Sequence, residues 1–166
     1  YVIIGPPATG KTTALRQSGL HFPLELDDDL RGVGGTRNCD WFFTEDAVLV
    51  DTAGRYVQQQ SDPEIDSAEW QGFLDMLKKH RGKRALNGVI LTLSLKELLA
   101  GEAAVREHGR EIRKRLAELR ERLQIQLPVY LMLTKVDLVP GFEAFFGNLP
   151  TKEREQVWGA TLPTDA

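Results

Sequence analysis

The chain of 166 residues is long enough for one substantial core, and its composition of 42% apolar and 27% charged residues is that of a water-soluble globular domain. A net charge of −3 gives no reason to expect nucleic acid or an anionic membrane as a partner. No apolar stretch approaches the roughly 20 residues that a bilayer-crossing helix needs, and the single cysteine, Cys39, excludes an internal disulfide framework. The chain lacks an initiating Met and begins inside a predicted strand, so we expect one domain, residues 1–166, cut from a longer protein.

The first predicted element is an apolar strand, residues 1–4, which leads into Gly-Pro-Pro-Ala-Thr-Gly-Lys-Thr at 5–12 and then a helix over 11–17. A strand, a glycine-punctuated loop and a helix in this order are typical of a phosphate-binding loop. The glycines let main-chain N–H groups turn toward an anion, Lys11 can reach the terminal phosphates, and the Thr12 hydroxyl can ligate Mg²⁺. A glycine-rich turn without a ligand is the alternative. The nucleotide-binding residues predicted here are Gly5, Pro6, Pro7, Ala8, Thr9, Gly10, Lys11, Thr12 and Thr13.

Residues 18–37 are rich in glycine and aspartate and show no periodicity, which predicts a mobile loop. Within it, Thr36 occupies the place where GTPases carry a threonine whose hydroxyl ligates magnesium when the γ-phosphate is present. A surface loop with an incidental threonine is the alternative interpretation.

Two short strands over 40–44 and 47–51, separated by two residues, predict an antiparallel hairpin. The second strand ends in Asp-Thr-Ala-Gly at 51–54, where Asp51 can hold magnesium through water and the N–H of Gly54 can meet a γ-phosphate. An aspartate that caps the following turn is the alternative. The next residue, Arg55, stands where small GTPases place a water-orienting glutamine, and arginine has no acceptor for that task. Arg55 is predicted either to stabilise developing phosphoryl charge or to form a salt bridge, and hydrolysis is predicted to be slow.

The remaining pattern alternates helices over 63–80 and 102–123 with strands over 88–94 and 129–134, and a last edge strand is predicted over 157–162. The predicted fold is therefore a three-layer α/β domain of the small-GTPase-like P-loop type, with a mostly parallel sheet, one antiparallel hairpin strand and helices on both faces. The helix 102–123 is expected to bury one apolar stripe and to expose the arginines and glutamates between, supported by pairs four residues apart. The stripe is Ile112, Leu116, Leu119 and Leu123, and the pairs are Glu111 with Arg115 and Glu118 with Arg122.

Thr-Lys-Val-Asp at 134–137 follows the strand 129–134 and is similar to the base-reading motif of GTPases, with threonine in the first place. Asp137 can accept hydrogen bonds from the ring N–H and the exocyclic amine of guanine, whereas adenine presents an acceptor there. Lys135 would lie over the purine. Thr134 lacks the amide that usually ties this motif to the phosphate loop, so the predicted affinity is modest. A strand end followed by a turn is the alternative.

Longer strings at 32–44 and 47–56, with shorter ones at 87–89, 128–130 and 156–159, resemble the NTPase domain of the TssM (IcmF-like) family of bacterial type VI secretion systems. This resemblance implies a parent protein held in the inner membrane by segments outside this chain, and a domain that faces the cytoplasm. It also implies partners among the membrane-complex and baseplate proteins of that system.

Together these features predict a switch domain that binds Mg²⁺ with GTP or ATP, prefers GTP, hydrolyses it slowly and is coupled to the secretion complex. An ATPase that powers a mechanical step and a structural module without turnover are the alternatives.

Overall fold

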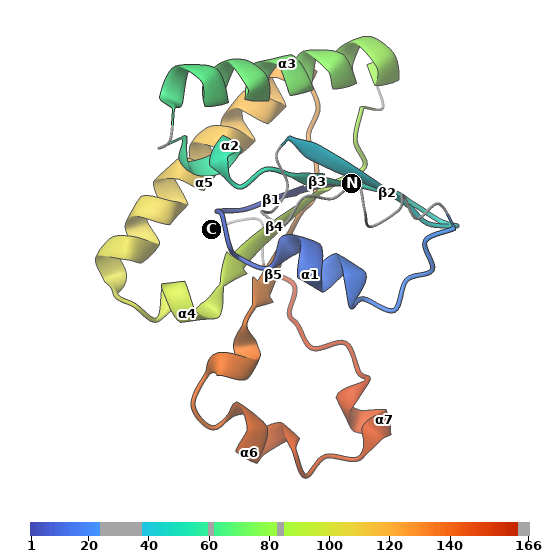
Figure 1. The fold of residues 1–166 in the computed structure, drawn as a ribbon, viewed down its shortest axis with the longest axis vertical. Helices are drawn as coiled ribbons and strands as arrows, with labels where there is room; N and C mark the ends of the chain where they lie inside the picture. The colour runs from blue at the N-terminus through green and yellow to red at the C-terminus, as the bar shows by residue number, and fades with distance from the viewer. Residues whose placement is uncertain (24–37, 60–61, 83–84, 163–166) are drawn as a thin grey trace.

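The computed structural model describes residues 1–23, 38–59, 62–82 and 85–162, and its centre is a five-stranded sheet of order β2-β3-β1-β4-β5 (Figure 1). β1, β3, β4 and β5 run parallel to one another, whereas β2 pairs with β3 antiparallel. The strands are β1 (Val2–Ile4), β2 (Cys39–Phe43), β3 (Val48–Thr52), β4 (Val89–Ser94) and β5 (Val129–Thr134). The predicted mostly parallel sheet with one antiparallel hairpin is confirmed.

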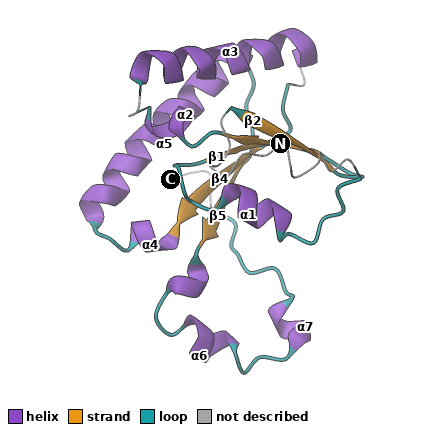
Figure 2. Cartoon of the chain, in the orientation of Figure 1, coloured by secondary structure: helices purple, strands orange, loops and turns teal. Residues whose placement is uncertain are grey.

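Helices lie on both sides of the sheet, and the last two helices, which follow the last strand, lie away from it, as Figure 2 shows. They are α1 (Lys11–Arg16), α2 (Arg55–Gln58), α3 (Pro63–Arg81), α4 (Leu95–Leu98), α5 (Glu102–Leu123), α6 (Phe142–Phe146) and α7 (Thr151–Arg154), with a 3-10 turn η3 (Val136–Leu138). The side chain of Asp62 accepts a hydrogen bond from the Ile65 N–H at 3.3 Å, and Pro63 stands at the first helical position, so α3 begins with two favoured start signals.

Two apolar clusters lie on the two faces of the sheet, because successive side chains of a strand point in opposite directions. Val2 and Ile4 of β1 belong to the larger cluster, which includes Trp70 of α3 and Leu119 of α5. Ile3, between them, belongs to a smaller cluster with residues of α1, β2 and β3, namely Leu15, Phe42 and Leu49. The expected three-layer arrangement with helices on both faces is therefore confirmed.

Ile112, Leu119 and Leu123 of the predicted α5 stripe are buried and Leu116 is half-buried against the same core, but the polar residues of α5 differ from the prediction. Arg115 is only 1% exposed, and the carboxylate of Glu118 both pairs with it at 2.8 Å and accepts the Trp70 indole N–H at 2.9 Å. Arg122 pairs instead with Asp75 of α3. The two predicted four-residue pairs, Glu111 with Arg115 and Glu118 with Arg122, are wrong, because Arg115 pairs with Glu118 three residues further along α5 and Arg122 pairs with Asp75 across the interface with α3.

The predicted edge strand over 157–162 is also wrong. These residues have no regular structure, and Val157 and Trp158 are 100% and 76% exposed. A β-prone sequence forms a strand only where it can pair with a sheet and bury one face, and this segment does neither. No helix in the described part of the chain is long and apolar enough to cross a membrane.

Candidate functional site

The loop of residues 5–12 connects the carboxyl end of β1 to α1, and Lys11 lies folded against it. The Lys11 ammonium donates to the main-chain carbonyls of Gly5 at 3.0 Å and Pro6 at 3.1 Å, and the residue is 6% exposed. Burial lowers the pKa of Lys11, and the nearby Asp51 carboxylate opposes this shift. Ala8 and Gly10 adopt the left-handed conformation, with φ of 57° and 85°, which allows the loop to curl.

Asp51 and Thr12, 39 residues apart in the sequence, meet at this loop. The Thr12 hydroxyl donates to a carboxylate oxygen of Asp51 at 2.5 Å, and Asp51 is buried on β3, paired in register with Ile3 of β1. A hydroxyl and a carboxylate side by side are hard oxygen donors that suit Mg²⁺ in a site completed by phosphates and water. Among the described residues there is no group of three or more His, Cys, Asp or Glu side chains that could hold a metal ion.

Gly54 packs directly on the loop 5–12. A Cβ at this position would lie 2.4 Å from the Cα and the N of Pro7, so only glycine fits. On the other side of the loop, a Cβ on Gly5 would lie 2.4 Å from the carbonyl oxygen of Thr92. The hydroxyls of Thr52 and Thr92 donate to the main chain of β1 at 2.8 and 3.0 Å. The loop is therefore held between the ends of β3 and β4, and sequence reasoning missed both threonines because each reads as an ordinary strand residue.

A cavity of about 400 Å³ lies beside the loop. Its lining consists of Pro7, Ala8, Gly10, Lys11, Thr12, Thr13, Thr52, Ala53, Gly54 and Arg55. The structure thus brings together the residues predicted from two motifs that are separate in the sequence. Thr36, the third predicted magnesium ligand, lies outside the described residues.

The 134–137 motif reaches the same loop from the end of β5. The Thr134 hydroxyl lies 2.5 Å from the Thr9 carbonyl oxygen, to which it donates, and 3.2 Å from that of Leu93. The prediction that the 134–137 motif lacks a bond to the loop is therefore wrong, because the Thr134 hydroxyl forms one in place of the usual amide. Lys135 has φ of 56°, and Asp137 is exposed in η3.

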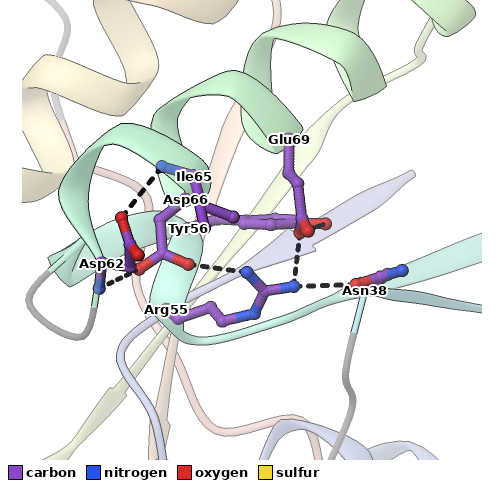
Figure 3. Close-up of polar contacts among 7 residues, drawn as sticks. All are labelled: Asn38, Arg55, Tyr56, Asp62, Ile65, Asp66 and Glu69. Atoms are coloured by element: carbon purple, nitrogen blue, oxygen red, sulfur yellow. Dashed lines mark hydrogen bonds and ion pairs between the residues drawn. The ribbon is translucent and has the colours of Figure 1, made fainter.

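Arg55 takes part in a polar cluster that Figure 3 shows. Its guanidinium donates to Asp66 at 2.6 Å and to Asn38 at 2.7 Å, and it also pairs with Glu69. The salt-bridge role considered for Arg55 is therefore present, while a direct role at a phosphate stays a prediction. Asn38, Asp66 and Glu69 were not predicted, since nothing in their local sequence marks them as partners of residue 55.

A family model of the IcmF-related N-terminal domain matches residues 63–166. The chain belongs to the IcmF-related family. It is also 54% identical, over 99% of its length, to the type VI secretion system component TssM1 of Pseudomonas aeruginosa, and it spans 15% of that relative. The resemblance to TssM and IcmF proteins drawn from the sequence is confirmed at the level of the family.

Proposed function

We propose that this domain binds a purine nucleoside triphosphate together with Mg²⁺ in the cavity beside the loop 5–12. The observation that carries the proposal is the 2.5 Å hydrogen bond between Thr12 and Asp51, next to the buried ammonium of Lys11. This bond places two hard oxygen donors, from segments 39 residues apart in the sequence, beside the curled loop that holds the Lys11 ammonium. This is the chemistry that a magnesium–triphosphate group requires.

Lys11 would bind the terminal phosphates by exchanging its two carbonyl partners, Gly5 and Pro6, for phosphate oxygens. This exchange is favourable because a hydrogen bond between two charged groups is stronger than one to a neutral carbonyl. Thr12 and Asp51 would hold Mg²⁺, which would neutralise phosphate charge. The N–H of Gly54, whose close packing fixes it against the loop, would face the γ-phosphate.

We infer a preference for GTP over ATP from the 134–137 motif. The bond from Thr134 to Thr9 supports this inference, because it ties the base-reading motif to the predicted phosphate loop. Asp137 would accept from the ring N–H and the amine of guanine, and Lys135 would lie over the ring. The exposed position of Asp137 leaves its carboxylate open to a ligand.

Hydrolysis would be slow, with a turnover below about 1 per second, the lower end of the common enzyme range. Within the described part of the chain, the residues that line the cavity include no glutamine, glutamate or histidine that could orient water, and Arg55 is engaged in ion pairs. Since the relative TssM1 is a type VI secretion component, we propose that nucleotide state is coupled to assembly of that system's membrane complex. The partners would be membrane-complex and baseplate proteins met on the cytoplasmic side of the inner membrane.

The direct test is a titration of the purified protein with fluorescent GTP and ATP analogues, with and without Mg²⁺. We expect magnesium-dependent binding, tighter for GTP, and loss of binding in Lys11→Ala. Asp137→Asn should weaken GTP and strengthen the xanthine nucleotide, whose additional carbonyl matches an amide donor. Absence of binding by either triphosphate to the folded protein would refute the proposal, and an unchanged base preference in Asp137→Asn would remove Asp137 from base reading.

A further inference from the structure

Arg55 connects three elements that meet at the edge of the candidate site (Figure 3). Its Nη1 atom donates to Asp66 of α3, and its Nη2 atom donates to Asn38, which precedes β2, and to Glu69 of α3. The ring of Tyr56 lies 5.1 Å from the guanidinium carbon, and its hydroxyl donates to Glu69 at 3.3 Å. The planar guanidinium therefore serves acceptors on two sides at once from one rigid fork, a geometry that the ammonium of lysine does not reproduce.

The charges in this cluster are unequally exposed. Asp66 is buried, whereas the side chains of Arg55 and Glu69 are 27% and 38% exposed. A buried carboxylate without its cation is strongly unfavourable, so Asp66 holds the guanidinium at α3. Moving that guanidinium onto a phosphate would leave Asp66 without this partner.

The cluster is continuous with the wall of the cavity. Arg55 directly follows Gly54, whose backbone touches Pro7 of the loop 5–12. The Ala53 N–H donates to the Asn38 carbonyl oxygen at 2.8 Å, so Asn38 binds both the main chain of residue 53 and the side chain of residue 55. The position of residues 52–54 at the cavity is thus tied to the first turns of α3 through Arg55.

We propose that Arg55 is a positioning residue, which holds the segment 52–54 against the loop 5–12 through Asp66 and Glu69 and does not contact the phosphates. This inference rests on the proposed function, since it states that α3, through Arg55, controls the shape of the proposed nucleotide site. The acidic pair on α3 sets where Gly54 lies, and hence how well the cavity receives a triphosphate.

The first arm of the test needs no nucleotide. Hydrogen exchange of the amides of residues 53–58 is compared in the wild type, Glu69→Gln and Asp75→Asn. Asp75 is the matched control, because it is also an acidic residue of α3 paired with an arginine, Arg122, but its pair lies on α5, away from the cavity. We expect the amides of residues 53–58 to exchange faster in Glu69→Gln and at the wild-type rate in Asp75→Asn. The reason is that glutamine keeps a hydrogen-bond acceptor at position 69 but removes the charge that holds the Arg55 guanidinium. Equal exchange in the two variants would overturn the proposal.

The second arm measures the affinity of Arg55→Lys, Glu69→Gln and the double variant for a fluorescent GTP analogue in the presence of Mg²⁺. Each single change is expected to weaken binding about tenfold, equivalent to ~1.4 kcal/mol, and the double variant should be no weaker than Arg55→Lys alone. Arg55→Lys keeps a cation beside Asp66, so we expect this variant to fold. If Glu69→Gln binds like the wild type while Arg55→Lys does not, Arg55 acts directly on the nucleotide and the proposal is wrong. If the wild type binds neither triphosphate, the proposed function fails, and the exchange arm still decides whether Arg55 holds the segment.

Discussion

Gly54→Ala is the substitution for which the structure predicts the sharpest effect. The new methyl carbon would lie 2.4 Å from two backbone atoms of Pro7, about 1 Å inside the separation at which carbon atoms attract one another. Neither side can move freely, because Pro7 belongs to the loop held by β3 and β4, and residue 54 is held through Arg55. Overpacking of this kind costs about 1–3 kcal/mol, so Gly54→Ala should reduce the free energy of unfolding by that amount.

Gly72→Ala is its matched control. Gly72 lies within α3 on an exposed face, and a Cβ there meets no atom within 4 Å. The same substitution should stabilise the protein by about 0.5–1 kcal/mol, since alanine is the better helix former. Urea unfolding followed by the far-ultraviolet circular dichroism of the helices measures both, with opposite displacements of the midpoint expected. If Gly54→Ala unfolds at the same or a higher urea concentration than the wild type, the close approach of residue 54 to the loop 5–12 is wrong.

Four further predictions concern individual residues. Thr134→Ala removes the hydroxyl that binds Thr9 and should weaken GTP binding by about 2- to 10-fold, whereas Thr134→Ser should bind like the wild type, as fluorescence titration would measure. Burial, with the carboxylates of Asp40 and Asp51, raises the pKa of the Cys39 thiol from 9.0 to about 12, so iodoacetamide at pH 8 should modify the folded protein at least about 100-fold more slowly than the urea-unfolded chain. Because the unfolded chain releases this proton first, the contribution of Cys39 to the free energy of unfolding is expected to fall as pH rises above about 9, which urea titrations of the wild type and Cys39→Ala would compare. Trp70→Phe loses the indole bond to Glu118 and leaves a space in the core, which should reduce the free energy of unfolding by about 1–3 kcal/mol; an unchanged urea midpoint would contradict this.

Much of the fold could be predicted from local pattern, because apolar periodicity and start signals act over a few residues. The strands around 1–4 and 129–134 and the helices over 63–80 and 102–123 were placed correctly within one or two residues. The short helices α2, α4, α6 and α7 were not predicted, since four or five residues carry too little periodicity to mark a helix. The segment 157–162 shows the opposite error, because a strand-like sequence needs a sheet edge that only the folded chain can supply.

The residues of the candidate site that lie in motifs could likewise be predicted from the sequence. Gly5, Lys11, Thr12, Asp51 and Gly54 were selected from motifs in which the residue type at each position is itself the signal. The motif order along a mostly parallel sheet also predicted that they would meet, because the carboxyl ends of parallel strands lie at one edge.

The sequence alone therefore determined the class of fold, the family resemblance and the group of residues that form the candidate site. Only the tertiary structure decided which partners the polar residues choose: Arg55 with α3, Arg122 with Asp75 of α3, and Thr134 with the loop 5–12. The physical reason is that hydrogen bonds and ion pairs depend on distances of a few ångströms between groups up to 125 residues apart in the chain, as for Thr134 and Thr9. Motifs and periodicity are local in sequence, whereas these contacts are local only in space.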